Sequence, residues 1–329
     1  MDLELLGWNE RRQHEFTAYA TVGLLPGRVV GEHRSHYRVA TEAAELTAAV
    51  SGRVRNAAAE RSDLPGVGDF VAVRRAEGDD PATIEAVLSR TTALVRKASG
   101  ERRPQLLAAN IDAAFIVTAA DGDFNLARIE RYLALVRESG ADPVIVLNKS
   151  DLTHDLIGPT SQIAGIAPGV PVHIVSARDP DCIREIARYF DGNRTIVLIG
   201  SSGVGKSTLT NQLVGGAAQE TQEVRAYDSR GRHTTTHRQL FPRSEGGALI
   251  DTPGLRGLEL WNIPIGVPTG FDDVEALAAQ CKFRDCQHDR EPGCAVRAAV
   301  ERGDLDAERC ASYAKISLPN QTRRGRHRP

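Results

Sequence analysis

The chain has 329 residues, 41% of them hydrophobic and 26% charged, with a formal net charge of −2. This length predicts two or three domains, and no apolar run approaches the roughly 20 residues that a membrane-spanning helix needs. The near-neutral charge excludes a nucleic-acid binder that is basic throughout, so contacts with nucleic acid must use local patches. The N-terminus has no basic segment followed by an apolar one, so we expect a cytoplasmic protein without a secretory signal or membrane contact.

Short strands separated by turns are predicted for the N-terminal part of the chain. Alternation around Val71 and Val73 and the turn at Leu64–Asp69 indicate a β-rich domain. The expected strands are Gly27–Gly31, Tyr37–Thr41, Leu46–Arg55, Asp69–Arg74 and Thr83–Leu88. Five short strands are typical of a small β-barrel such as an OB-fold, which often binds oligonucleotides on one face. A small barrel used only for packing is the alternative.

From Asp112 the pattern changes to strands alternating with helices. Apolar residues recur at helical spacing before Gly140, which is expected to end the helix, at positions Leu126, Ile129, Leu133 and Val136. Short runs rich in Val, Ile and Leu are typical of buried parallel strands. They lie at Ala114–Thr118, Val144–Leu147, Val172–Val175, Thr195–Ile199 and Ala248–Ile250. The pattern predicts a doubly wound α/β domain.

After about Ile263 the strand patterns stop and helices are expected instead. The helical segments are Phe271–Gln280, Cys294–Arg302 and Leu305–Ile316, followed by a basic tail over residues 323–329 that we expect to be disordered. The chain is therefore divided into three domains. These are an N-terminal segment with an OB-fold RNA-binding domain (1–100), an α/β domain (101–262) and a mainly helical domain with the basic tail (263–329).

A glycine-rich segment follows the predicted strand Thr195–Ile199. Residues 200–207, Gly-Ser-Ser-Gly-Val-Gly-Lys-Ser, match the phosphate-loop pattern G-x-x-x-x-G-K-[ST] at every fixed position. Glycines let backbone N–H groups approach phosphate oxygens, Lys206 would neutralise β/γ-phosphate charge, and the Ser207 hydroxyl would ligate Mg²⁺. The predicted nucleotide-binding residues here are Gly200, Ser201, Ser202, Gly203, Val204, Gly205, Lys206, Ser207 and Thr208.

The segments that follow two further predicted strands indicate which nucleotide base is bound. Asn148-Lys149-Ser150-Asp151 follows Val144–Leu147 and matches the N-K-x-D guanine motif. The Asp151 carboxylate can accept hydrogen bonds from N1–H and the exocyclic amine of guanine, which adenine does not offer, and such a site discriminates strongly because the wrong base leaves polar groups unpaired. Asn148 would support the loop and the base, and the Lys149 stem would cover the ring. Ser176-Ala177, after Val172–Val175, is similar to the companion motif whose backbone N–H meets the guanine oxygen.

The γ-phosphate side is predicted from the segment Asp251-Thr252-Pro253-Gly254, which fits D-x-x-G. Asp251 would hold Mg²⁺ through water, and the Gly254 N–H would sense the γ-phosphate. Between the phosphate loop and this motif lies a segment with three threonines at 234–236, where a switch threonine should close over Mg²⁺. Thr235 and Thr236 are both candidates for this role.

The order of these motifs is unusual. Ras-like GTPases run from phosphate loop through D-x-x-G to N-K-x-D, whereas here N-K-x-D and Ser-Ala come before the phosphate loop. This is a circular permutation. Since all the motifs follow parallel strands, whose carboxyl ends line one edge of a sheet, they can still assemble one site.

A cysteine cluster lies in the C-terminal domain. Five cysteines are too few for a disulfide scaffold, but Cys281, Cys286, His288 and Cys294 form C-x4-C-x-H-x5-C. Three thiolates and one imidazole are a complete ligand set for one structural, tetrahedral Zn²⁺ with no open position for catalysis. The surrounding segment is short and polar, so we expect it to need the metal to fold.

Taken together, these motifs resemble the bacterial ribosome small subunit-dependent GTPase A, a circularly permuted GTPase family. The resemblance covers about residues 25–318 and includes Gly-Arg-His-Thr-Thr-Thr at 231–236. It implies a GTPase that binds the small ribosomal subunit and its rRNA, assists late maturation of the subunit, and hydrolyses GTP faster when bound there. The barrel and the zinc domain would both contact the subunit, and we expect a monomer with GTP or GDP, Mg²⁺ and one Zn²⁺ as its ligands.

Two alternatives stay open for the group that orients the attacking water. Many GTPases have glutamine just after D-x-x-G, but this chain has Leu255, which cannot orient water. The resemblance nominates His233, and the alternative is that ribosomal RNA completes the site. A second hypothesis for the whole protein is a GTP-dependent RNA-binding switch whose output is occupancy rather than hydrolysis.

Overall fold

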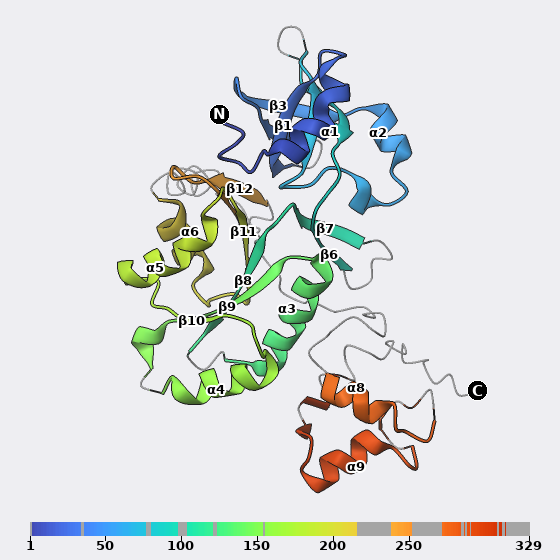
Figure 1. Ribbon diagram of the computed structural model, residues 1–329, viewed down its shortest axis with the longest axis vertical. Coiled ribbons are helices and arrows are strands. Elements are labelled where there is room, and N and C mark those ends of the chain that lie inside the picture. Colours follow the sequence, from blue (N-terminus) through green and yellow to red (C-terminus); the bar gives the residue numbers. More distant parts are fainter. Residues whose placement is uncertain are drawn as a thin grey trace, which may run out of the picture.

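Three parts make up the computed structural model: a small barrel, a central α/β domain and a C-terminal helical unit (Figure 1). The structure describes residues 2–33, 36–76, 80–97, 104–120, 124–153, 155–215, 238–251, 272–283, 286, 288–289, 291–307, 309–310 and 313. Within these residues, no helix combines the length and apolar character that crossing a bilayer requires.

The N-terminal barrel is closed and has the strand order of an OB-fold. Its strands are β1 (Leu25–Glu32), β2 (Tyr37–Ala40), β3 (Glu45–Val50), β4 (Phe70–Arg74) and β5 (Ala82–Val87). They pair in the order β1-β2-β3-β5-β4, and β4 returns to pair with β1; β3 and β5 are parallel and the other pairs antiparallel. Valines from alternate positions fill the barrel interior. The predicted five-stranded barrel is confirmed.

One predicted strand of the barrel is wrong in its second half. The expected strand Leu46–Arg55 ends at Val50 and is followed by α2 (Gly52–Ala57) and the 3-10 helix η1 (Arg61–Asp63). The cause is Ser51, whose side chain accepts a hydrogen bond from Val54 N at 3.2 Å and so caps a helix at the point where the alternation stops.

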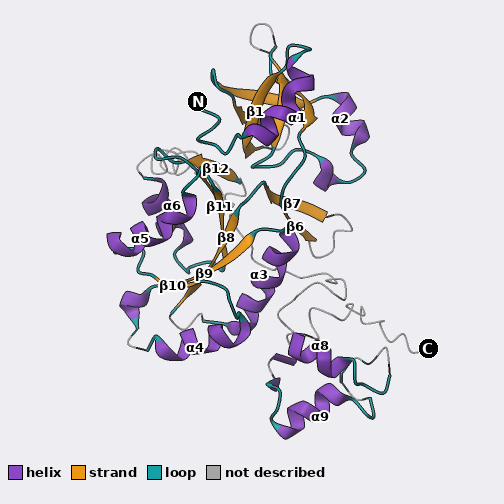
Figure 2. Cartoon of the chain, viewed as in Figure 1, coloured by secondary structure: helices purple, strands orange, loops and turns teal. Residues whose placement is uncertain are grey.

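An N-terminal helix that the sequence reading did not anticipate, α1 (Glu10–Ala20), packs beside the barrel (Figure 2). Arg12 from this helix and Arg28 from β1 lie on the ring of Phe70, with guanidinium carbons 4.7 and 4.6 Å from its centroid. Arg28 is fully buried and donates to the carbonyls of Leu6, Gly68 and Asn110. Burial lowers the pKa of Arg28 to about 9. This network joins the N-terminal segment to the barrel and to the start of the α/β domain.

A two-stranded hairpin, β6 (Ala93–Lys97) with β7 (Pro104–Ala109), leads from the barrel into the α/β domain. Gly66 and Gly68 of the barrel lie against it. A Cβ on Gly66 would come within 2.6 Å of the Leu106 side chain, and one on Gly68 within 2.1 Å of the Ala109 carbonyl oxygen. Glycine at these two positions therefore permits close packing of barrel and hairpin.

The central domain is a doubly wound α/β sheet, as predicted. Its strands are β8 (Ala113–Ala119), β9 (Asp142–Asn148), β10 (Val172–Ile174), β11 (Thr195–Gly200), β12 (Gln239–Pro242) and β13 (Ala248–Asp251). They lie in the order β10-β9-β8-β11-β13-β12, and all are parallel except β12, a strand that the sequence did not predict. β12 also pairs with β1 at Gly31 and Gln239, which joins this sheet to the barrel.

Helices cover both faces of the sheet. One face packs α3 (Leu126–Ser139) and α4 (Ile157–Ile166), and the other packs α5 (Pro180–Ala187) and α6 (Lys206–Val214). As predicted, Gly140 ends α3, with a left-handed φ of 83°. Short 3-10 helices complete the connections, η2 at Ser150–Leu152 and η3 at Arg188–Phe190.

The C-terminal unit contains α8 (Asp272–Ala278) and α9 (Ala295–Arg302), close to two of the predicted helices. In the third predicted helix, Leu305–Ile316, residues 305 and 306 are not helical, whereas the other described residues, at 307, 309, 310 and 313, are. The core of this unit includes Ala134 of α3, so α3 forms part of its packing surface.

Candidate functional site

The phosphate loop joins β11 to α6 through three glycines with positive φ: 153° at Gly200, 88° at Gly203 and 96° at Gly205. These angles are rarely adopted by residues with a side chain. A Cβ on Gly205 would also meet the Asn148 amide nitrogen at 2.3 Å. The loop thus needs glycine for two reasons: its backbone has positive φ angles, and the Asn148 side chain packs directly against Gly205.

Asn148, at the end of β9, connects three of the predicted motifs. Its amide nitrogen donates to the Val204 carbonyl at 2.8 Å, and its side-chain oxygen accepts from Ala177 N at 3.0 Å. The side chain is buried. Because both hydrogen bonds are shielded from water, this one residue holds the N-K-x-D, Ser-Ala and phosphate loops together at one edge of the sheet.

Lys206, the first residue of α6, lies over the phosphate loop. Its ammonium donates to the carbonyl oxygens of Gly200 at 2.8 Å and Ser201 at 2.6 Å. Burial lowers the pKa of Lys206, and the charge of Asp251 opposes this shift. Asp251 ends β13, and the register places it beside Leu198 of β11. The cation and the carboxylate therefore both lie at the carboxyl ends of the central strands, next to the loop.

The remaining described candidates surround this edge. Lys149 adopts a left-handed φ of 62°, which turns the chain from β9 into η2, and Asp151 lies exposed in η2. Ser176 is buried, and its hydroxyl accepts from Arg178 N at 3.3 Å. The residues of the phosphate loop that are open to solvent are Ser202, Gly203, Ser207 and Thr208. The loop thus presents an accessible face on which an anion could bind.

Four candidates lie outside the described residues. They are His233, Thr235, Thr236 and Gly254. The same holds for Leu255 and for all of residues 252–271, which connect Asp251 to α8.

The predicted metal ligands converge in the C-terminal unit. One ligand atom from each of Cys281, Cys286, His288 and Cys294 lies within 4.8 Å of all the others. The Cys281 and Cys294 sulfurs are 3.9 Å apart, and they lie 3.6 and 3.4 Å from His288 Nδ1. Tetrahedral zinc with Zn–S bonds of about 2.3 Å separates its sulfurs by about 3.8 Å. The donor set and its spacing therefore fit one zinc ion.

An ion-pair cluster that sequence reasoning missed docks this unit on α3. Arg309 pairs through one guanidinium nitrogen with the buried Glu130 of α3. Its other two guanidinium nitrogens donate to the two carboxylate oxygens of Asp273 in α8, at 2.8 and 2.9 Å. Glu130 is 5% and Arg309 15% exposed, so water screens the pair poorly. The one signal for it in the sequence is a charged residue on the apolar side of the α3 pattern.

The parallel sheet, the phosphate loop after β11 and the motif loops after β9, β10 and β13 define a P-loop GTPase whose chain order is circularly permuted. Comparisons with known proteins agree. Residues 87–261 match the model of the RsgA GTPase family. A small ribosomal subunit biogenesis GTPase RsgA from Opitutus terrae is 46% identical over 326 residues, covering 96% of this chain and 89% of the relative. A relative of the same name from Syntrophotalea carbinolica is 43% identical over 324 residues, covering 96% and 88%.

Solved structures show the same architecture. YjeQ from Thermotoga maritima aligns with a TM-score of 0.62 and 28% identity, covering 89% of this chain and 97% of that one. YloQ, described as a circularly permuted GTPase, aligns with a TM-score of 0.57 and 27% identity, covering 89% and 93%. The chain belongs to the RsgA GTPase family, and its enzymatic class is GTP hydrolase.

Proposed function

We propose that this chain binds GTP at the loops joined by Asn148, hydrolyses it, and thereby assists late maturation of the small ribosomal subunit. Small-subunit biogenesis is the role that the names of its relatives print. The observation that carries the nucleotide part is the hydrogen bonding of Asn148 to Val204 and Ala177, since it holds base-reading and phosphate-binding loops together.

In the proposed complex each loop has its own task. Asp151 accepts two hydrogen bonds from the guanine base, Lys149 covers the ring, and the Ala177 region meets the guanine oxygen. Lys206, whose ammonium is satisfied by the carbonyls of its own loop, would turn to the β- and γ-phosphates, where a fixed cation stabilises charge that develops during transfer.

Magnesium is the second ligand that we propose. Ser207 and a switch threonine, Thr235 or Thr236, would hold it, with Asp251 acting through water and the Gly254 N–H at the γ-phosphate. When bound, the ion would neutralise negative charge on the phosphates. For the attacking water, His233 and an element of ribosomal RNA remain the two candidates, because Leu255 offers no polar group.

Zinc, held by the three cysteines and His288, would have a structural role. With four protein ligands, no coordination position is left for a substrate. The ion would fix the short connections around α8 and α9 and so shape the surface that this unit presents to a partner.

The partner surfaces follow from the three proposed domains, residues 1–100, 101–262 and 263–329. The boundary near residue 100 falls between β6 and β7. We assign the barrel and the zinc unit to contacts with the small subunit and its rRNA, and we expect a cytoplasmic monomer.

Co-sedimentation with purified small subunits tests this function and separates hydrolysis from occupancy. The chain should sediment with subunits in a non-hydrolysable GTP analogue and be released in GTP. Release that is equally fast with the analogue would favour the occupancy switch, and no sedimentation in any nucleotide state would overturn the ribosomal assignment.

A further inference from the structure

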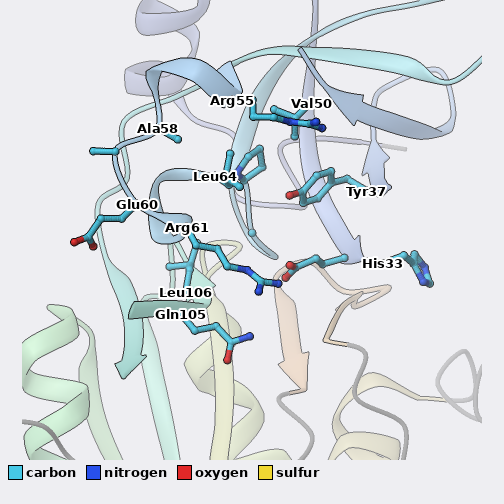
Figure 3. A pocket seen from close by; sticks show the side chains of 14 residues that line it. His33, Tyr37, Val50, Arg55, Ala58, Glu60, Arg61, Leu64, Gln105 and Leu106 are labelled. Carbon is cyan, nitrogen blue, oxygen red and sulfur yellow. The ribbon is translucent and has the colours of Figure 1, made fainter. Parts of the chain in front are cut away.

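A cleft of about 650 Å³ lies between the barrel and the β6–β7 hairpin, away from the nucleotide loops. One side comes from β1, β2, α2 and η1, and the other from Gln105 and Leu106 of β7. Figure 3 shows the Tyr37 hydroxyl and the Arg61 guanidinium directed into this space, while Glu60 points away from it. The volume is in the range of sites that hold small organic molecules or single nucleotides.

Two cations of the cleft are available for a ligand. Arg55 of α2 and Arg61 of η1 are exposed, and within the described part of the chain neither side chain makes a hydrogen bond or ion pair. Both charges act on the hydroxyl of Tyr37. Both arginines line the same cleft as Tyr37, so one ligand bound there can meet all three side chains.

Tyr37 supplies an aromatic surface between these cations. It is half-buried against the barrel core, and burial together with the charge of Glu32 raises the pKa of its hydroxyl to about 12. The phenol therefore stays neutral at physiological pH and can donate a hydrogen bond to a ligand. The Gln105 side chain also lines the cleft; its amide oxygen accepts a hydrogen bond from Arg96 at 3.4 Å, and its amide nitrogen can donate to a ligand.

One arginine side chain connects the two walls of the cleft through an ion pair and a hydrogen bond. Arg238, the residue before β12, pairs with Glu32 of β1 at 3.4 Å and donates to the Leu106 carbonyl of β7 at 3.0 Å. Its side chain is 14% exposed. Because one guanidinium binds both walls, their separation does not depend on a ligand.

We propose that this cleft binds one nucleotide of single-stranded RNA, with its base on Tyr37 and its flanking phosphates on Arg55 and Arg61. An aromatic ring, free cations and a side-chain amide are the groups that recognise an unstacked nucleotide. The described lining of the cleft shares no residue with the nucleotide site proposed above. The inference rests on the proposed function, since it takes an RNA partner from there.

Fluorescence anisotropy of the full chain with a short fluorescein-labelled oligouridine, titrated at several salt concentrations, tests the site. Arg55→Ala/Arg61→Ala should weaken binding and flatten the log–log salt dependence by about 1.4, because each contact to a single strand contributes about 0.7. Tyr37→Leu should weaken binding about 10-fold without changing that slope, since base stacking releases no counterions. Tyr37→Phe should retain most of the affinity.

The matched control is Arg75→Ala, which removes an exposed barrel arginine outside the cleft. Its salt dependence should stay as in the wild type. An equal effect of Arg75→Ala, or wild-type binding by the Arg55/Arg61 variant, would overturn the site. Competition with uridine monophosphate gives a further test. If the monophosphate displaces the probe as effectively as unlabelled oligouridine at the same concentration, the site is also overturned, because the cleft would then bind free nucleotides. Unchanged melting temperature and GDP affinity in each variant exclude misfolding.

The outcomes also separate this inference from the proposed function. If the cleft variants bind the probe normally while GTP turnover by the wild-type chain responds to small subunits, the RNA site in the cleft is refuted and the proposed function is retained. If the variants lose probe binding while small subunits do not change GTP turnover by the wild-type chain, the RNA site is retained and the proposed function is refuted.

Discussion

Replacing Asn148 with alanine removes the residue that joins three loops of the proposed nucleotide site. The change leaves the Val204 carbonyl and the Ala177 N–H without partners in a buried position. Leaving a buried polar group unsatisfied costs about 1–3 kcal/mol, so the two together should cost about 3 kcal/mol. For a domain of this size that corresponds to a fall in melting temperature of roughly 6–12 °C. Since the loops lose their common anchor, GDP affinity should also fall, by about 10-fold or more.

A matched control comes from Asn110, which is the other asparagine buried among the described residues. Asn110 accepts a hydrogen bond from Arg12 at 2.7 Å at the junction of barrel and α/β domain. Its φ is 52°, so Asn110→Gly removes the side chain without adding backbone strain. Calorimetry of both variants should show a lower melting temperature, and titration with GDP should show weaker binding only for Asn148→Ala. Wild-type GDP affinity in Asn148→Ala would refute the idea that this residue holds the site together.

Four further changes test other parts of the site. Asp151→Asn should weaken GTP and favour xanthosine triphosphate, because an amide donates where the carboxylate accepts; equal GTP affinity in titration calorimetry would show that Asp151 does not read the base. Lys206→Ala should lower GTP turnover by about 10²–10³-fold, as expected for a lost electrostatic contact to the transition state, and an unchanged rate would place the active site elsewhere. Cys286→Ser should release zinc and abolish turnover stimulated by small subunits while sparing GDP binding; full stimulation without zinc in the same preparation would contradict the structural role. Glu130→Ala should leave Arg309 incompletely paired and weaken docking of the C-terminal unit by about 3 kcal/mol, seen as faster proteolysis of that unit, whereas the exposed Glu138→Ala on the same helix should change nothing.

The motifs and the strands that precede them could be predicted from the sequence, because both depend on local patterns. The phosphate loop, the guanine loop and the cysteine spacing each combine fixed residue types at short separations. Short apolar runs correctly marked the parallel strands, since strands buried on both faces are continuously hydrophobic.

The contacts between distant segments could not be predicted in this way. Glu130 and Arg309 are 179 positions apart, and Arg238 is 132 positions from the carbonyl that it binds. Helix α1 was missed because a short helix whose buried face includes an arginine, Arg12, lacks a clear apolar pattern. Strand β12 was missed because its four residues end in a proline, which the sequence rules treat as unfavourable for a strand.

The central claim is that a GTPase built on the Asn148-centred loops acts on the small ribosomal subunit. GTP turnover by the wild-type chain, measured with and without purified small subunits, tests it most directly. We expect slow turnover by the chain alone and clearly faster turnover when subunits are added. Measurable turnover that subunits leave unchanged would contradict the claim.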